Sequence, residues 1–327
     1  MDSNFPRILF MKFTARHLMV FCVFALISNA SQAGEQVRDY PLAKIAAHTY
    51  VIHGPLGYPS VENQGFMNNP GFVITKTGVV VIDPGSSLQA GRMLLKQMRT
   101  VTKLPVTHVF NTHVHGDHWL GNHAIIEAYP KAVLIGHAEM IKKLHAGEAE
   151  QWVALMDKST NGFTRGTKAL VPTVIARDGE TFKIGGMTFR IYAPENAHSH
   201  TDIMIESVEE SVVFTGDNVL NQTIGRMVDG TFAGNIAACD KIAAVKAKHY
   251  VPGHGPSGDV SIVNIYRQYL SILFSTVKQQ YDLGKSDYEM KDAVVAKLKP
   301  YQNWNRFELE VGPHISLAVL ELEAFIQ

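Results

Sequence analysis

Short apolar runs, separated by turns rich in glycine, proline and asparagine, occupy most of the chain up to residue 255. Runs that alternate or are wholly apolar predict strands. They lie at residues 48–53, 72–75, 79–82, 106–111, 132–135, 181–184, 187–192, 202–205, 211–214 and 249–251. Apolar residues at helical spacing lie between several of these runs, for example at Ala90, Met93, Leu94 and Met98. The order of strands and helices is typical of an α/β (α+β) fold.

The pattern changes after Pro256, where apolar residues recur only with helical spacing. Ser286 and Glu289 have the spacing of a capping box and begin a helix that we expect to stop at Pro300. A last amphipathic helix is expected from His314 to Phe325.

The predicted strands fall into two similar halves with helices around them. We therefore expect a four-layer αββα sandwich, in which two mixed β-sheets pack face to face and are flanked by helices. The predicted domain covers residues 34–260, and residues 261–327 form a C-terminal helical extension that packs on the same domain.

Residues 1–33 have the features of a cleaved secretory signal peptide. Lys12 and Arg16 precede ten apolar residues, 18–27, and small residues precede a cut after Ala33. Ten residues are too few to span a bilayer, which disfavours an anchor helix. The mature protein is therefore expected to be periplasmic or secreted, with no membrane association after cleavage.

The charge and the cysteine content of the chain limit the kinds of partner and cross-link that we expect. Thirty basic residues balance thirty acidic ones without a basic run, which argues against nucleic acid as a partner and favours a small-molecule substrate. Of the two cysteines, only Cys239 lies outside the predicted signal peptide, so no internal disulfide is expected. We expect Cys239 to be a buried small residue.

Four possible metal ligands lie within six residues, at His113, His115, Asp117 and His118. The predicted strand 106–111 ends just before them and a short predicted helix follows. Sites in open α/β proteins are commonly built at this carboxyl end of a strand. Since three histidines and a carboxylate crowded there would be left unpaired, the motif indicates a divalent metal.

Further polar residues follow other apolar runs. They are Asp83, one of His198 and His200, Asp217 and His254. Imidazole and carboxylate ligands together suit Zn²⁺, Mn²⁺ or Fe. We expect these segments to meet at one edge of the sheets.

The chain contains, in order, a His-x-His-x-Asp-His motif, a lone histidine, Gly-Asp after a strand and Gly-His-Gly. This ordered set, over residues 45–260, is similar to that of the metallo-β-lactamase superfamily. The resemblance implies the αββα fold and two divalent ions, Zn²⁺ in the first place with Mn²⁺ or Fe as alternatives. It implies one metal at His113, His115 and His198, a second at Asp117, His118 and His254, and Asp217 as the bridge. The spacing to Ser199 and Asp202 favours His198, and His200 stays open as the alternative.

Two metal ions about 3.5–4 Å apart can lower the pKa of a bridging water toward ~7 and polarise a carbonyl group. The sequence therefore predicts a hydrolase that attacks an ester, lactone, thioester or related carbonyl substrate. Asp117 is expected to orient the hydroxide as well as to bind metal. Asp83 is expected to support the ligand histidines at the catalytic site, with a helix cap together with Ser86 as the alternative.

Other functions stay open. Asp217 argues against a dedicated β-lactamase, because the true β-lactamases of the family lack a bridging carboxylate here, although weak β-lactam hydrolysis is an alternative. No basic substrate-binding motif follows His254, which disfavours glyoxalase II. The predicted export signal and the helical tail are similar to a periplasmic branch near quinoprotein and sulfur-oxidation systems. A mononuclear iron oxygenase for persulfides and a non-catalytic periplasmic metal-binding protein are further alternatives.

Two segments are candidates to cover the site. The long loop 54–70 carries Tyr58, Phe66 and Asn69, and loops of this length inside a domain are commonly functional. Residues 137–171 are interrupted by glycines and are expected to form a lid or a surface insertion. The substrate, the native metal and the oligomeric state do not follow from the sequence.

Overall fold

The computed structural model describes Met1 and residues 34–324. The predicted signal peptide, apart from Met1, lies outside the described residues. Within the described part, no helix combines the length and the apolar character needed to cross a bilayer.

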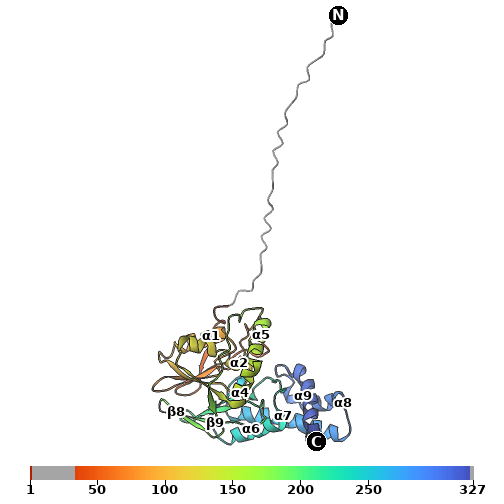
Figure 1. Cartoon of the computed structure of the whole chain (residues 1–327). Helices are drawn as coiled ribbons and strands as arrows, with labels where there is room; N and C mark the ends of the chain where they lie inside the picture. The colour runs from red at the N-terminus through yellow and green to blue at the C-terminus, as the bar shows by residue number, and fades with distance from the viewer. Residues whose placement is uncertain (2–33, 325–327) are drawn as a thin grey trace. The chain divides into compact units, whose positions relative to one another are not determined.

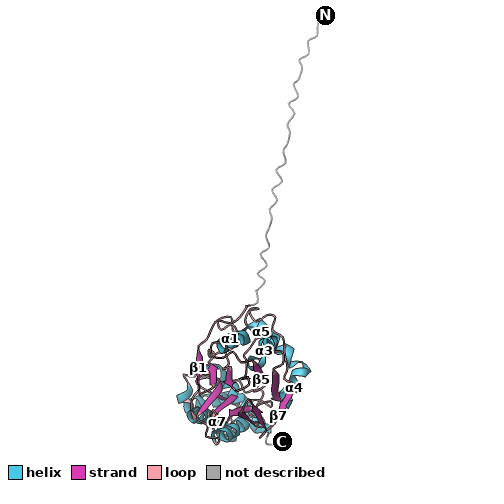
Figure 2. Cartoon of the chain, turned by 90° about the vertical axis from the view of Figure 1, so that its left-hand side faces the viewer, coloured by secondary structure: helices cyan, strands magenta, loops and turns pink. Residues whose placement is uncertain are grey.

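Two mixed β-sheets form the centre of the domain (Figure 2). The first has the order β1-β2-β3-β4-β5-β6-β7, with antiparallel neighbours up to β4 and parallel neighbours from β4 to β7. Its strands are β1 (Leu42–Lys44), β2 (Thr49–Ile52), β3 (Gly71–Ile74), β4 (Val79–Ile82), β5 (Val106–Phe110), β6 (Val133–His137) and β7 (Val174–Ala176).

The second sheet has the order β12-β11-β10-β9-β8, and only β11 and β12 in it are parallel. Its strands are β8 (Thr181–Ile184), β9 (Met187–Tyr192), β10 (Met204–Ser207), β11 (Val212–Leu220) and β12 (His249–His254). With helices on the outer faces of both sheets, the predicted four-layer sandwich is confirmed (Figure 2).

The alternation of side chains along each strand explains the layers. In β4, Val80 and Ile82 belong to the core between the two sheets, whereas Val79 and Val81 belong to the core beneath α1 (Leu88–Met98) and α3 (Asn122–Ala128). Because both faces of this strand are buried, every residue in it is apolar. The strand accordingly lies inside the sheet, between β3 and β5.

Three long helices follow the second sheet, namely α7 (Val260–Asp282), α8 (Asp287–Lys297) and α9 (Phe307–Ala324). Helix α7 packs on β11 and β12, α6 (Phe232–Ala243) packs on α7 and β11, and α8 and α9 pack on α7 and on each other. All of them share one apolar core with the second sheet (Figure 1). The predicted capping box is confirmed at the start of α8, between Ser286 and Glu289. The C-terminal extension thus packs directly against the strands that carry the second half of the candidate site.

Several elements differ from the prediction. Strands β1 and β7 and helix α6 were not predicted, since they are short or lack a clear apolar period. The short helix expected after the motif is two helices, α2 (Gly116–Trp119) and α3, which are separated at Leu120 and Gly121. Gly121 lies so close to Pro84 that a Cβ atom there would be 2.3 Å from the Pro84 carbonyl oxygen. The segment after β6 contains α4 (Ala138–Lys143), a π-helical turn with Gly147 at φ 111°, and α5 (Ala149–Ser159).

Candidate metal centre

The seven candidate ligands lie at the ends of strands from both sheets. His113 and His115 follow β5, and Asp117 and His118 occupy the first turn of α2. Strand β4 runs parallel to β5, and β11 runs parallel to β12, so the carboxyl ends of each pair point to one edge. The second sheet contributes Asp217 from β11, His254 from β12 and His198 from the loop before β10.

The side chains gather in two groups whose ligand atoms lie within 4.8 Å of one another. One group is His113, His115, His198 and Asp217, and the other is Asp117, His118 and His254. These groups coincide with the two ligand sets that the resemblance implies. All of these side chains except His115 are buried.

Asp217 lies between the two groups. One of its carboxylate oxygens is 3.6 Å from His198 Nε2 and 3.5 Å from His254 Nε2, and the other is 3.2 Å from His118 Nε2. The Nε2 atoms of His118 and His254 are themselves only 3.4 Å apart. A carboxylate in this position can bind cations in both groups at once.

Most of the histidines are oriented by a hydrogen bond from the ring nitrogen that faces away from the centre. His118 Nδ1 donates to Asp83 at 2.8 Å, and His254 Nδ1 donates to the carbonyl of Met67 at 2.8 Å. His115 Nε2 donates to Asp229 at 2.9 Å, so that its Nδ1 faces the centre. Such partners fix the tautomer and leave the other ring nitrogen free for a metal.

His113 is oriented through Thr112. The Thr112 hydroxyl donates to Asp83 at 2.7 Å, and therefore its oxygen can only accept from His113 Nδ1, 3.0 Å away. His113 Nε2 is then buried without a partner among the described residues, and one oxygen of Asp217 lacks hydrogen-bond geometry to any neighbour there. Buried polar atoms left in this way are expected at a metal site.

The charges of the cluster fit the same conclusion. Burial lowers the pKa of His113 well below its usual value and that of His198 to about 3, so both rings are neutral and able to act as ligands. Burial alone would lower the pKa of His254, but Asp217 and Asp117 raise it to about 9. Since cations can replace the protons that these side chains share, the residues present fit a divalent metal.

The structure resolves the choice between the two neighbouring histidines. His198 Nε2 lies 3.2 Å from His115 Nδ1, inside the first group. His200 is exposed and hydrogen bonds to Asn196. The loop is shaped by Asp202, which accepts from the backbone of Ser199 at 2.7 Å and from its hydroxyl at 2.6 Å.

Asp83 lies behind the ligands, in the supporting place that the sequence predicted, and is not among the residues that line the cavity. Its carboxylate contacts His118 and Thr112, which gives it a positioning role. It does not cap the following helix either, because the side chain of Ser87 accepts from Ala90 N there.

The long loop 54–70 contributes only in part to covering the site. Tyr58 lines the cavity, as expected. Phe66 is fully buried and packs with Tyr40, so it is a core residue and cannot cover a substrate. Asn69 donates to the carbonyls of Pro252 and Gly255 and so fixes the turn that carries His254.

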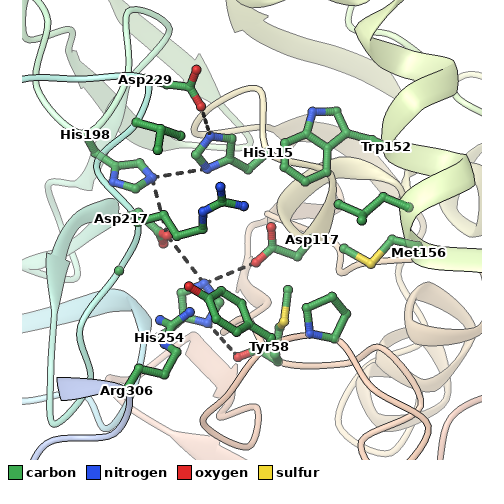
Figure 3. A pocket seen from close by; sticks show the side chains of 16 residues that line it. Tyr58, His115, Asp117, Trp152, Met156, His198, Asp217, Asp229, His254 and Arg306 are labelled. Carbon is green, nitrogen blue, oxygen red and sulfur yellow. Dashed lines mark hydrogen bonds and ion pairs between the residues drawn. The ribbon is translucent and has the colours of Figure 1, made fainter. Parts of the chain in front are cut away.

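A cavity of about 260 Å³ opens over the ligands. Its wall is formed by Tyr58, Pro59, Met67, His115, Asp117, Trp152, Leu155, Met156, His198, Asp217, Gly225, Arg226, Val228, Asp229, His254 and Arg306. Figure 3 shows Trp152 and Met156 of α5 on one side and Arg306 on the other, with Asp117 between them. The predicted lid or insertion 137–171 thus supplies an apolar wall.

Sequence reasoning missed three polar residues of this site, Asp229, Arg226 and Arg306. Asp229 and Arg226 lie in the loop between β11 and α6, and Arg306 lies just before α9. None follows an apolar strand or belongs to a motif. Asp229-Gly230 offered a turn signal at most, and no contiguous basic motif marks Arg306.

Comparison with known proteins identifies the family. The profile described as the metallo-β-lactamase superfamily matches residues 64–254, more than half of the chain, and the chain belongs to this superfamily. A probable metallo-hydrolase of Streptococcus pyogenes serotype M6 is 25% identical over 201 residues, 58% of this chain and 79% of that protein. An atrochrysone carboxyl ACP thioesterase of Emericella nidulans is also 25% identical, over 61% of this chain and 54% of its own length.

Solved structures show the same fold. A metallo-β-lactamase from Pontibacter korlensis superposes with a TM-score of 0.57 at 22% identity, over 71% of this chain and 98% of the other. A stereoselective inverting sec-alkylsulfatase from Pseudomonas sp. superposes with a TM-score of 0.67 at 14% identity, over 86% of this chain and 50% of the other. The chain therefore spans about half the length of the thioesterase and of the sulfatase.

Proposed function

We propose that this protein is a metal-dependent hydrolase that cleaves an ester, thioester, lactone or related carbonyl substrate. The observation that carries the proposal is the convergence of five histidines and two aspartates, with unpartnered ligand atoms, at the base of a cavity. His113, His115 and His198 would hold one divalent ion, Asp117, His118 and His254 a second, and Asp217 would bind both. We propose Zn²⁺ as the native ion.

When bound, divalent ions of this kind supply a hydroxide near neutral pH, by lowering the pKa of a water toward ~7, and a Lewis acid for the substrate carbonyl. The residues of the protein orient the water and the ligand side chains. Asp117 lines the cavity and can accept a hydrogen bond from the attacking water, which orients the water toward the carbonyl. Asp83, Thr112, Asp229 and the Met67 carbonyl hold the ligand rings in place.

The shape of the cavity supports a substrate with an apolar part. Trp152, Leu155 and Met156 project from α5 over the ligands, and Met67 and Val228 extend the apolar wall. The ring centroid of Trp152 lies 5.2 Å from that of His115. An apolar group on the substrate would pack there while its carbonyl lies over Asp117 and Asp217.

The names of two relatives support the proposed hydrolase, and one of them names a carbonyl substrate class. One matching protein is named a thioesterase and another a probable metallo-hydrolase.

We also propose that the chain is exported to the periplasm, on the basis of the signal-peptide features of residues 1–33.

The test is a panel of zinc-loaded protein with esters, thioesters, lactones, phosphodiesters, sulfate esters and β-lactams. We expect turnover of at least one carbonyl ester or thioester, lost on chelation and restored by Zn²⁺. His115→Ala should remove turnover and lower metal content, whereas His200→Ala, at an exposed histidine two positions after the ligand His198, should leave both intact. Stoichiometric zinc without turnover of any carbonyl substrate would refute the hydrolase proposal.

A further inference from the structure

Two arginines line the cavity without a carboxylate partner. Arg226 makes no ion pair within residues 34–324, and Arg306 has only Thr223 as a hydrogen-bond acceptor, at 3.3 Å. The Nε atom of Arg306 is buried with no partner among the described residues. Arg226 is exposed at the rim of the cavity, whereas Arg306 is largely enclosed. A buried guanidinium group usually finds a carboxylate, so Arg306 in particular is available for a negatively charged ligand, with Arg226 beside it in the wall.

The two arginines belong to one rigid unit. Ile224 N donates to the Asn305 carbonyl at 3.0 Å and Asn305 N donates to the Gln222 carbonyl at 3.0 Å, which ties the loop of Arg226 to the segment of Arg306. His314 of α9 adds a 2.7 Å hydrogen bond to the carbonyl of Gly225. The backbone that carries both arginines is therefore held in place before a ligand arrives, which reduces the entropy lost on binding.

Arg306 is held in place by further contacts. Its guanidinium carbon lies 4.6 Å from the centre of the Tyr58 ring, and Tyr58 in turn hydrogen bonds to Glu310 on α9. Arg306 adopts a φ of 65°, in the left-handed region that a residue with a long side chain rarely adopts. Such strain is commonly kept where a side chain has a function.

The charge of the cavity wall depends on the metal. Three carboxylates, of Asp117, Asp217 and Asp229, line the cavity together with the two arginines and balance their charge without metal. Two divalent ions bound at the ligands would make the wall positive. The charge of Asp117 and Asp217, which attracts Arg306 without metal, would then be taken up by the ions, and an anion would be attracted to the arginines.

Part of the cavity wall is apolar. Leu155 and Val228 are large apolar residues with 42% and 52% of their surface exposed at the wall of the cavity. Figure 3 places Trp152 and Met156 away from Arg306. The wall thus offers one apolar side and one cationic side, with the metal ligands between them.

We propose that Arg226 and Arg306 bind a carboxylate of the substrate, so that the substrate is an anionic ester or thioester whose apolar part packs on α5. This inference rests on the proposed function, because it names the substrate class of the same site. Two guanidinium forks match the two oxygens of a carboxylate, which favours this anion. The scissile carbonyl then lies between the carboxylate and the apolar group.

The first experiment compares two substrates on the zinc-loaded mature protein. They are the mono-4-nitrophenyl ester of glutaric acid, which is anionic, and 4-nitrophenyl pentanoate, which is neutral. We expect the kcat/KM ratio of anionic to neutral ester to fall about 10-fold or more in Arg226→Gln and in Arg306→Gln, the size expected for one lost charge-assisted hydrogen bond. Lysine at either position should retain part of the preference. Arg177→Gln, at an exposed arginine outside this cavity, should leave the ratio unchanged.

The second experiment measures binding without turnover, so that the two proposals can fail separately. Zinc-loaded protein is titrated calorimetrically with 4-phenylbutyrate and with 4-phenylbutanamide, its neutral analogue. We expect the carboxylate to bind at least 10-fold more tightly, and both glutamine variants to lose most of that difference. A preference that persists in both variants would mean that the metal ions alone take the anion, which overturns the inference. An arginine-dependent preference without turnover of either ester would support the anion site and count against the hydrolase.

Discussion

Asp83→Asn tests whether one buried carboxylate orients ligands of both metal ions. Asp83 is 4% exposed and accepts three hydrogen bonds, from His118 Nδ1 at 2.8 Å, Thr112 N at 2.8 Å and Thr112 Oγ1 at 2.7 Å. Its φ of 51° lies in the left-handed region, which asparagine tolerates better than alanine. The asparagine variant therefore changes the charge and one acceptor without adding backbone strain.

The expected effect follows from the hydrogen-bond chain. Asp83 fixes His118 directly and fixes His113 through the Thr112 hydroxyl, and these two histidines belong to different ligand groups. In Asp83→Asn, an amide NH₂ group replaces one carboxylate oxygen and faces N–H or O–H donors of Thr112 and His118, to which it cannot act as an acceptor. Removing such a partner commonly weakens metal binding by about 10–100-fold, which corresponds to about 1.4–2.8 kcal/mol. We expect both ions to be weakened.

The assay is a zinc titration of chelator-stripped protein in competition with a chromophoric chelator, together with metal content after dialysis. Asp229→Asn is the matched comparison, because Asp229 holds His115 alone and should weaken one ion. Asp259→Asn is the control, since Asp259 caps α7 by accepting from Ser261 N and has no hydrogen bond or ion pair to a ligand residue among the residues described. It should lower the free energy of unfolding by about 1 kcal/mol or less and leave zinc affinity unchanged.

Two results would refute the reasoning. If Asp83→Asn binds two zinc ions with the affinity of the parent, the carboxylate does not orient the ligands. If only the ion at His118 is weakened, the link through Thr112 to His113 has no energetic importance. Circular dichroism of the zinc-free variants shows whether either result comes from loss of the fold.

Further predictions concern the helical extension and the core. Burial lowers the pKa of His314 to about 4, so the unfolded chain binds more protons than the folded chain below pH 6.5. The free energy of unfolding of the chelator-treated protein should therefore fall by up to about 3 kcal/mol as the pH decreases from 6.5 to 4. Denaturant titrations of chelator-treated His314→Gln should show a shallower fall with pH, and an equal dependence on pH in both proteins would contradict this. Glu321 accepts from Phe232 N at 2.6 Å and Ala233 N at 3.0 Å at the start of α6, so Glu321→Ala should lower the unfolding midpoint, by about 1–2 kcal/mol in free energy, without changing zinc content. Cys239 is fully buried and burial raises its pKa, so iodoacetamide should not modify it in the native protein but should after unfolding; rapid native labelling would show that the helix opens.

The sequence predicted those elements whose structure depends on a local pattern of residues. The strand Val79–Ile82 was predictable because a strand buried on both faces must be apolar throughout. The strand Val106–Phe110 was predictable because β-branched and aromatic residues are enriched in it after Pro105. The capping box at Ser286 was predictable because its two hydrogen bonds lie within one turn. Strand β7 and helix α6 were missed, since their place depends on the neighbours against which they pack.

The sequence by itself determined the ligand types, their order and the fold that would bring them to one edge, because imidazoles and carboxylates at strand ends have few other uses. Only the tertiary structure decided which atoms face the centre. It placed His198 inside the cluster and His200 outside, and it put Asp83 behind the ligands. It also brought Arg306 next to a site formed more than 50 residues earlier in the chain. Such contacts join segments with no shared local pattern, and they are set by packing of the C-terminal helices on the second sheet.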